Sequence, residues 1–348
     1  MKQIKSLIFL GVAVLCGVTF SSHVQAATTH GSCQDVRIPV SLDEGGNQNQ
    51  YIAGTFCTPT AWAAGTHQAD VMVAGATYDR TYWDASLENN KYSCVDKTLA
   101  AGRATLAIDR IGSGKSSFPP SVAITNISSA HTIHQAIQWI KNDRHVPNVN
   151  LIGHSIGAAL SIREAATYHD VDKLVVTATT HPFDIVNTLP ALLGAHPAVL
   201  DPQFADSGYE IGYITSSNGT RASSFYNTDV DPAVITYDEA HKAVLSLTEL
   251  TTTLLDVQTP AALNISQGVT APVLLVDGQN DKLYCEGLLN ADCSTNQKVI
   301  DHEKPFYPHA AVLDARIISN TGHTLTMSPT YQQSFDAINT WLQQENAD

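Results

Sequence analysis

Short apolar runs alternate with longer segments of mixed polarity along most of this chain. The runs span four or five residues and are rich in β-branched side chains, as buried strands are. They lie at residues 71–74, 104–108, 149–152, 174–177, 273–276 and 315–318. Helices are expected between them, at residues 87–101, 131–141, 156–168 and 329–345. Buried strands separated by helices predict an α/β fold, with a mostly parallel sheet that helices cover on both faces.

Two regions depart from this alternation. Near the beginning, residues 36–42 and 51–56 are typical of the two strands of a hairpin. Residues 182–267 are rich in Pro, Thr, Ser and Tyr and show only short helical patterns. We therefore expect a core at 27–181 and 268–348, with 182–267 inserted as a cap or lid. Such a cap would lie over the carboxyl ends of the strands, where open α/β sheets bind ligands. The alternative is a peripheral insertion without a role in specificity.

Residues 1–26 are predicted to be a signal peptide. Lys2 and Lys5 give it a positive start, and residues 7–18 form an apolar run that is too short to span a membrane. The stretch that ends at Ala26 has the small residues of a cleavage site. A retained N-terminal anchor is the alternative. Because no later stretch is long enough to cross a membrane, we expect an exported protein, periplasmic or secreted, without stable membrane insertion.

The chain that follows the predicted signal peptide is strongly acidic. Without Lys2 and Lys5 the 19 basic residues become 17, which against 33 acidic residues gives a formal charge of −16. A surface of this charge repels nucleic acids and anionic lipids, which argues against a nucleic-acid partner. It does not restrict a small neutral substrate, and the sequence indicates no oligomeric state.

Five of the six cysteines follow the predicted signal peptide, and an exported chain can keep disulfides. Cys33 and Cys57 flank the expected hairpin and are well placed to pair. Cys285 and Cys293 close a short loop after a predicted strand. Cys94 then remains, buried and free. Spacing alone does not determine connectivity, so the alternative is that Cys94 pairs and another cysteine is left over.

The strongest chemical signal is Gly153-His154-Ser155-Ile156-Gly157, which lies between a predicted strand and a predicted helix. G-x-S-x-G in this context is the nucleophile elbow of serine hydrolases, in which the glycines let strand and helix pass closely. Ser155 is therefore the candidate nucleophile. The histidine inside the motif is interpreted as a packing residue. A Gly/Ser-rich turn without chemistry is the alternative.

A serine nucleophile needs a base, and the base needs an orienting acid. On this kind of sheet the chain order is serine, acid, histidine. Asp281 ends a G-x-x-D turn after the strand at 273–276 and is the candidate acid, with Asp277 as the alternative. His323 lies in a Gly-His loop after the last strand and is the candidate base.

Acyl transfer also needs two N–H donors for the oxyanion. One is expected from Ile156, the residue after the nucleophile, because the first amides of a helix are free. The other is expected from Ala76, in the loop after the strand at 71–74, where Gly75 lets the backbone turn inward. Thr77 is the alternative donor.

No metal or cofactor is expected. Gly114-Lys115-Ser116 is similar to the end of a phosphate-binding loop, but the position that requires a further glycine holds Asp109. His131 and His134 share a predicted helix, yet neither H-E-x-x-H nor C-x-x-C occurs in the chain.

Together these motifs resemble the α/β-hydrolase superfamily over essentially all of residues 27–348. The elbow, the turn at 278–281 and Gly322-His323 follow the family's order, and residues 109–116 look like its D-x-x-G-x-G-x-S loop. The resemblance implies an eight-stranded, mostly parallel sheet, a cap after the sixth strand and acyl-enzyme chemistry. Many members have His-Gly where this chain has Ala74-Gly75. The sequence therefore does not indicate which side chain supports that loop.

We expect an exported serine hydrolase that cleaves a small or medium carboxylic ester and needs no cofactor. A lipase, a lactonase, or an amidase or peptidase with the same triad are alternatives. The mixed polar and aromatic sequence of 182–267 argues against the apolar lid of a lipase. A non-catalytic binding protein on this fold is an alternative from another class, and the presence of every triad residue argues against it.

Overall fold

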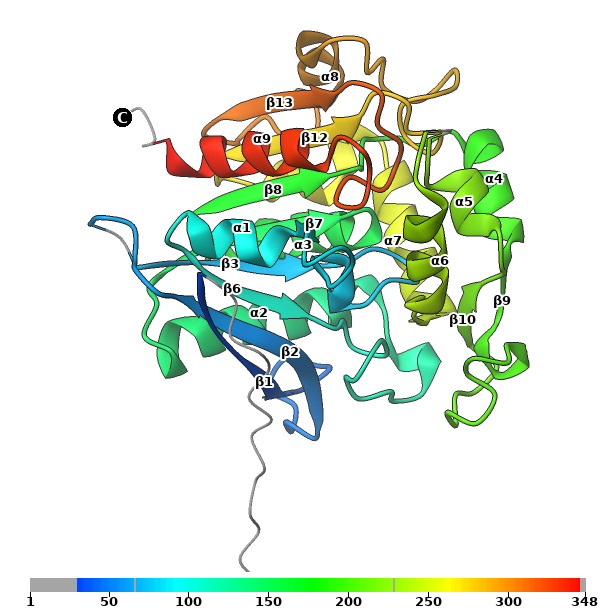
Figure 1. The fold of residues 1–348 in the computed structure, drawn as a ribbon, viewed down its shortest axis with the longest axis horizontal. Coiled ribbons are helices and arrows are strands. Elements are labelled where there is room, and N and C mark those ends of the chain that lie inside the picture. Colours follow the sequence, from blue (N-terminus) through cyan, green and yellow to red (C-terminus); the bar gives the residue numbers. More distant parts are fainter. Residues whose placement is uncertain (1–29, 66, 228, 345–348) are drawn as a thin grey trace, which may run out of the picture.

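A central sheet runs through the molecule (Figure 1). The computed structural model describes residues 30–65, 67–227 and 229–344, so the predicted signal peptide at 1–26 lies outside the described residues. The strands of the sheet follow the spatial order β1-β2-β6-β3-β7-β8-β12-β13. They are β1 (Gly31–Val40), β2 (Gln50–Pro59), β3 (Gln68–Val73), β6 (Ala104–Ile108), β7 (Asn148–His154), β8 (Lys173–Thr177), β12 (Val273–Gly278) and β13 (Leu313–Ile318). β2 pairs antiparallel with β1 and β6, and the other neighbours pair parallel, which confirms the expected eight-stranded, mostly parallel sheet.

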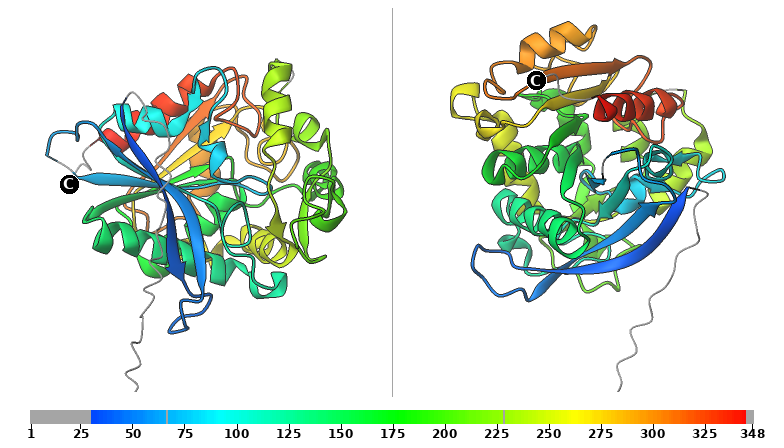
Figure 2. Two further views of the ribbon diagram at one scale, coloured as in Figure 1. Left: turned by 60° about the horizontal axis from the view of Figure 1, so that its bottom comes forward. Right: turned by 90° about the vertical axis from the view of Figure 1, so that its left-hand side faces the viewer.

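Helices cover both faces of this sheet (Figure 2). They are α1 (Cys94–Ala100), α2 (Asn126–Asp143), α3 (Ile156–Tyr168), α8 (Asn296–Glu303) and α9 (Tyr331–Gln343). α1 and α9 lie together on one face, and α2 and α3 lie together on the other. Because successive strand residues point to opposite faces, Val71 and Val73 of β3 join the apolar core under α2 and α3, whereas Met72 joins the core under α1 and α9.

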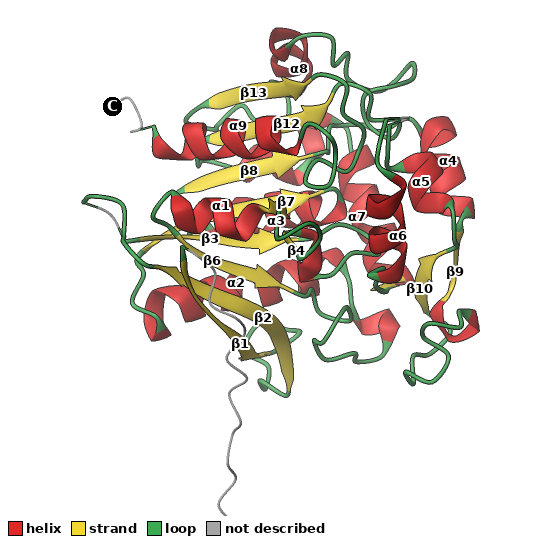
Figure 3. Ribbon diagram, in the orientation of Figure 1, coloured by secondary structure: helices red, strands yellow, loops and turns green. Residues whose placement is uncertain are grey.

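The segment 182–267 follows β8 and lies at the carboxyl ends of the parallel strands (Figure 3). Its elements are α4 (Ile185–Leu193), β9 (Ala195–Pro197), β10 (Tyr213–Ser216), α5 (Thr220–Ser224), α6 (Pro232–Ala240), β11 (Leu245–Ser246) and α7 (Leu247–Gln258). The three strands form a small sheet of their own, in the order β11-β10-β9. α7 packs against α2 and α3, which ties the segment to the core.

Short elements connect the larger ones. The two-stranded ladder consists of β4 (Asp84–Ala85) and β5 (Tyr92–Ser93). Single turns of 3-10 helix are η1 (Arg80–Tyr82), η2 (Ser121–Ala123), η3 (Ala198–Leu200), η4 (Ala261–Leu263) and η5 (Ile265–Gly268).

The helix expected at 87–101 is half as long as predicted, because its first half is a turn. Residues 88–90 all have positive φ, between 49° and 62°, which a right-handed helix does not use. α1 begins only after Ser93, whose side chain accepts a hydrogen bond from the Asp96 amide as an N-cap. The prediction of a helix upstream of Ser93 was therefore wrong.

Two disulfides are present in the described chain, Cys33–Cys57 and Cys285–Cys293. The antiparallel register of β1 and β2 places Cys33 directly opposite Cys57, with 4.1 Å between their Cα atoms. Cys94 is free and buried at the start of α1. None of the described helices has the length and apolar character that a membrane span requires.

Candidate active site

Ser155 occupies a sharp junction between β7 and α3. Its φ of 54° lies in a region that L-residues rarely adopt. A Cβ on Gly153 would lie 2.4 Å from the Cα of Ala158, and one on Gly157 would lie 2.4 Å from the carbonyl oxygen of Ala74. Strand and helix therefore pass too closely here for a side chain at either glycine.

Asp281 and His323 form a buried hydrogen-bonded pair. Nδ1 of His323 donates to Oδ2 of Asp281 at 2.8 Å, and their side chains are 2% and 0% exposed. Asp281 lies in the turn after β12 and also accepts a hydrogen bond from the Leu283 amide at 2.8 Å. A carboxylate on Nδ1 fixes the imidazole ring and leaves Nε2 as the nitrogen that can exchange a proton.

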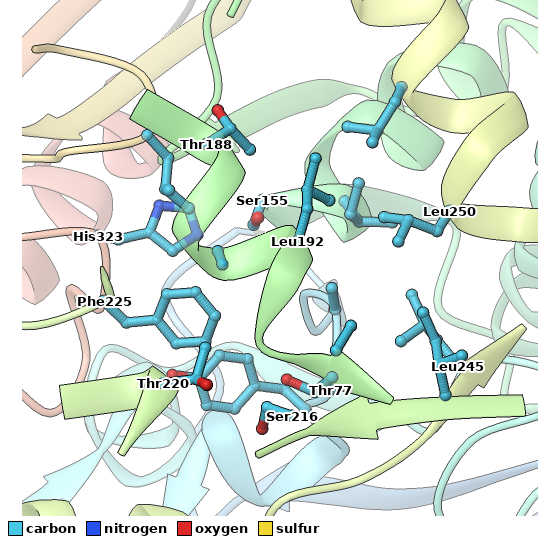
Figure 4. Close-up of a pocket in the computed structure, with 18 of the residues that line it drawn as sticks. Thr77, Ser155, Thr188, Leu192, Ser216, Thr220, Phe225, Leu245, Leu250 and His323 are labelled. Atoms are coloured by element: carbon cyan, nitrogen blue, oxygen red, sulfur yellow. The ribbon is translucent and has the colours of Figure 1, made fainter. Parts of the chain in front are cut away.

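Ser155 and His323 line the same end of one pocket (Figure 4). A serine–histidine–aspartate triad has two hydrogen bonds, one from serine to histidine and one from histidine to aspartate. This structure has the second, between His323 and Asp281. Among the described residues, Ser155 Oγ makes no hydrogen bond to His323. Catalytic hydrogen bonds are often longer in unliganded sites and tighten when substrate binds.

Asp277, the alternative acid, lies within β12. Its Oδ1 accepts a hydrogen bond from the Thr179 amide at 3.1 Å. Burial, and next the charge of Asp281, raise the pKa of Asp277 well above its usual range. Of the two aspartates, Asp281 is the one that contacts His323 in the described chain.

The two candidate oxyanion donors belong to residues that line the same pocket as Ser155. Ala76 and Ile156 both line the pocket. Ile156 opens α3, and the first amides of a helix have no partner within it. The alternative donor, Thr77, also lines the pocket, but its carbonyl accepts a hydrogen bond from the Ala243 amide at 2.8 Å and its hydroxyl accepts one from Arg221. Thr77 is thereby held toward the 182–267 segment.

Arg110 supports the loop that carries Ala76. Its Nη1 donates to the carbonyl oxygens of Ala74 and Gly75, at 2.5 Å and 2.6 Å. Its Nε faces a carboxylate oxygen of Glu249 in α7 at 3.4 Å, and both side chains are at most 1% exposed. Sequence reasoning missed this role, although Arg110 belongs to the 109–116 motif directly after β6, and its place in that motif was the available signal.

The empty space of the pocket, its open mouth included, is about 660 Å³, and its walls are mostly apolar. Leu192 of α4, Ile214 of β10 and Leu250 of α7 line it from the 182–267 segment and are its outer wall. Leu192 and Leu250 are labelled in Figure 4. The polar side chains other than those of Ser155 and His323 are hydroxyls. They belong to Thr77, Tyr78, Thr188, Ser216, Thr220 and Tyr284. The described lining therefore contains no lysine, arginine, aspartate or glutamate, and it suits an uncharged ligand.

Tyr284 is a pocket residue that sequence reasoning did not identify. Its ring stacks on His323 with 5.8 Å between centroids and 18° between planes. Burial, and next the charge of Asp281, raise the pKa of Tyr284, while its hydroxyl interacts with those of Thr179 and Ser155. Tyr284 therefore stays neutral and keeps a hydroxyl beside the nucleophile candidate. Its position three residues after Asp281 was the available signal.

His154 packs behind the site, as expected. Its ring stacks on Tyr82, with 4.2 Å between centroids and 13° between planes, and lies 4.9 Å from the ring of His323. Burial, and next the positive charge that His323 can carry, lower the pKa of His154 well below its usual range. His154 is consequently neutral in the folded protein.

Residues 71–337 match the model of a family described as the alpha/beta hydrolase family. No curated protein matches the chain. Similar solved structures include a thermophilic esterase from Thermogutta terrifontis, at 18% identity and a TM-score of 0.58, over 89% of this chain and 98% of that one. The esterase EaEST from Exiguobacterium antarcticum has 13% identity and a TM-score of 0.58, over 89% and 99%. The enol-lactonase from Burkholderia xenovorans LB400 has 14% identity and a TM-score of 0.57, over 85% and 97%. At these identities the structural likeness shows the fold.

Proposed function

The chain belongs to the alpha/beta hydrolase family, and from this premise we propose that it is an exported serine hydrolase that cleaves a carboxylic ester. Ser155 is the nucleophile, His323 the general base and Asp281 the orienting acid. The observation that carries this proposal is the buried hydrogen bond between His323 and Asp281 at the end of the pocket that Ser155 lines.

The reaction proceeds in two acyl transfers. Ser155 Oγ attacks the ester carbonyl carbon while its proton passes to Nε2 of His323, and Asp281 stabilises the imidazolium that forms. The amides of Ile156 and Ala76 hold the oxyanion. His323 then returns the proton to the leaving alcohol as the C–O bond breaks. Water repeats the sequence on the acyl-enzyme and releases the carboxylic acid. No cofactor takes part in these steps.

The substrate is a neutral ester with an apolar acyl group, and residues 182–267 act as the cap that shapes its pocket. The apolar outer wall from α4, β10 and α7 supports this assignment. A second hollow shares Leu192, Ile214 and Leu250 with the pocket and continues past Ile211 and Leu247. An acyl chain of medium length can extend from Ser155 along this wall.

A lipase is the second candidate, and one observation favours it. α4 exposes a row of large apolar side chains beside the pocket. The exposed fractions are 59% for Ile185, 71% for Val186, 45% for Leu189 and 76% for Leu193. An apolar lid surface of this kind suits a substrate held in an aggregate or lipid surface. The predicted signal peptide at 1–26 and the two disulfides support export for either candidate.

The test uses purified residues 27–348 with p-nitrophenyl esters from acetyl to palmitoyl, beside the variant Ser155→Ala. We expect hydrolysis with an optimum at medium chain length and its loss in the variant. The lipase would be favoured by an optimum at palmitoyl and by a rate of hydrolysis that increases once the ester concentration exceeds its solubility limit. A fluorophosphonate probe supplies the second readout, because it labels only an activated serine. Neither turnover nor labelling would leave the non-catalytic binding protein as the remaining explanation.

A further inference from the structure

A cluster of three ionisable side chains joins α2, α3 and the loop after α3. The two helices cover one face of the central sheet (Figure 1). His134 belongs to α2, Glu164 to α3, and Asp170 to the loop after α3. One nitrogen or oxygen from each lies within 4.8 Å of the others. Nδ1 of His134 is 2.9 Å from Oδ2 of Asp170 and 3.7 Å from Oε1 of Glu164. None of the three lines the pocket at Ser155.

The carboxylates of this cluster lack the hydrogen bonds that burial demands. Both oxygens of Glu164 and Oδ1 of Asp170 are buried and have no hydrogen-bond partner among the described residues. The side chain of Glu164 is 0% exposed. Buried polar groups in folded proteins are nearly always paired, and an unpaired buried carboxylate is especially unfavourable. Three such oxygens at one point indicate that the cluster holds a further group.

The neighbouring side chains do not supply the missing partner. Gln138 donates to the other oxygen of Asp170 at 2.6 Å, and the ammonium of Lys141 donates to the backbone carbonyl of Asp170. The ring of Tyr168 stacks on His134, with 3.9 Å between centroids. A protonated His134 offers one proton from Nδ1, which lies nearer to Asp170 than to Glu164. Burial raises the pKa of Glu164 to about 8, so the two carboxylates can share one further proton. A shared proton joins two of the three oxygens and leaves the third unpaired.

A divalent cation satisfies all three side chains at once. Zinc binds imidazole nitrogen and carboxylate oxygen at about 2.0–2.2 Å, so two ligands on a tetrahedral ion lie about 3.4 Å apart. The contacts of His134 with Asp170 and Glu164, at 2.9 Å and 3.7 Å, bracket this separation. Calcium and magnesium favour sets made of oxygen alone, whereas a set that includes imidazole suits a first-row transition ion.

We propose that His134, Glu164 and Asp170 form a structural site for a first-row divalent transition ion, with zinc as its best-fitting representative. The side chains of His134 and Asp170 are 22% and 14% exposed, so the ion can reach the site from solvent and keep water as its fourth ligand. The site joins α2, α3 and the loop that leads into β8. Because α3 begins directly after Ser155, the ion braces the far end of the helix that carries the nucleophile candidate.

Zinc binding to the full-length mature chain, prepared without a histidine tag and treated with a chelator, tests this proposal. We expect one zinc ion per chain in isothermal titration calorimetry and in a chromogenic chelator competition. Zinc at a hundred times its Kd should raise the Tm by about 4 °C or more, and magnesium should leave it unchanged. The readouts do not depend on hydrolase activity, so the proposal stands or falls separately from the proposed function.

Variants separate this site from adventitious binding by other histidines. Glu164→Gln keeps the shape of the side chain and removes its charge, and it should abolish the single zinc site. His134→Gln, at a partly exposed position, provides the same test where the buried variant does not fold. Glu44→Gln is the matched control, because Glu44 accepts a hydrogen bond from the adjacent Tyr168 at 3.2 Å but lies outside the cluster. It should bind zinc as the unmodified chain does.

Two results would overturn the proposal. The first is a metal-free chain that takes up neither zinc nor manganese and gains thermal stability from Glu164→Gln, which would mean that the carboxylates share a proton instead. The second is zinc binding of unchanged stoichiometry in both Glu164→Gln and His134→Gln, which would place the ion elsewhere.

Discussion

Replacing Arg110 with methionine should slow catalysis although Arg110 does not line the pocket. The change removes the two hydrogen bonds, at 2.5 Å and 2.6 Å, that hold the carbonyls of Ala74 and Gly75. Ala76, the proposed oxyanion donor, comes next in the chain. Complete loss of one oxyanion donor costs about 10²- to 10³-fold in kcat. Here the donor remains but its loop loosens, so we expect kcat to fall about 10- to 100-fold, or about 1.4–2.7 kcal/mol. KM should change little, because the donor acts mainly in the transition state.

The same substitution has a cost in stability that must be separated from the effect on rate. Arg110 and Glu249 are buried together, at 1% and 0% exposed. Removing one charge from a buried pair costs about 3–5 kcal/mol, because the other charge stays buried without compensation. Glu249→Gln in the same chain removes the second charge and keeps an acceptor for the hydroxyl of Ser129, which now donates to Glu249 at 2.7 Å. The double variant should therefore recover most of the stability and keep the loss in kcat.

Steady-state hydrolysis of a p-nitrophenyl ester and unfolding in guanidinium chloride measure the two effects. Arg103→Met is the matched control, since Arg103 forms a buried pair with Asp70 at 2.8 Å and does not contact the oxyanion loop. It should lower the free energy of unfolding to a similar extent and leave kcat unchanged. A folded Arg110→Met/Glu249→Gln variant that keeps the kcat of the unsubstituted chain would refute the positioning role of Arg110. An equal loss of kcat in Arg103→Met would refute it too.

Three further predictions concern the acid, the neutral histidine and a disulfide. Asp281→Asn should lower kcat about 10⁴-fold with little change in fold, because the histidine tautomer is no longer held, and steady-state kinetics with a circular dichroism spectrum check this. The folded-state pKa of His154 lies below its unfolded value of 6.5, so the unfolded chain binds more protons as the pH falls below 6.5. The free energy of unfolding should thus decrease as the pH falls below 6.5, toward a limiting slope of about 1.4 kcal/mol per pH unit, and guanidinium titrations of His154→Gln should lack this contribution. Removing the Cys33–Cys57 bridge, which spans 24 residues, should lower the free energy of unfolding by about 3 kcal/mol in Cys33→Ala/Cys57→Ala, as chemical denaturation would report.

The sheet was predictable because its strands are short, apolar and rich in β-branched residues, and because helices separate them in the sequence. The candidate site was predictable wherever a glycine fixes the backbone beside it, as at Gly153 and Gly157, whose missing Cβ atoms leave 2.4 Å to neighbouring backbone. The turn at 88–90 was not predictable, because three consecutive left-handed residues leave the helical spacing of their side chains intact in the sequence.

Contacts between distant segments were also beyond the sequence pattern. Arg110 and Glu249 are 139 positions apart, and their pairing depends on how α7 packs against the core. His134 and Glu164 lie on separate helices, and periodicity shows only that each has a polar residue at that position. Tyr284 follows Asp281 closely, but nothing in its spacing indicates that its ring turns back onto His323.

The uncharged lining of the pocket has a consequence for product release. The proposed reaction converts a neutral ester into a carboxylic acid that is ionised at neutral pH, and the described lining has no lysine or arginine to hold the resulting anion. A carboxylate in an apolar enclosure is strongly disfavoured relative to water. The net charge of the molecule acts in the same direction, since a formal charge of −16 on residues 27–348 repels anions. The acid product should therefore leave readily and inhibit weakly, so that accumulated product slows the reaction little.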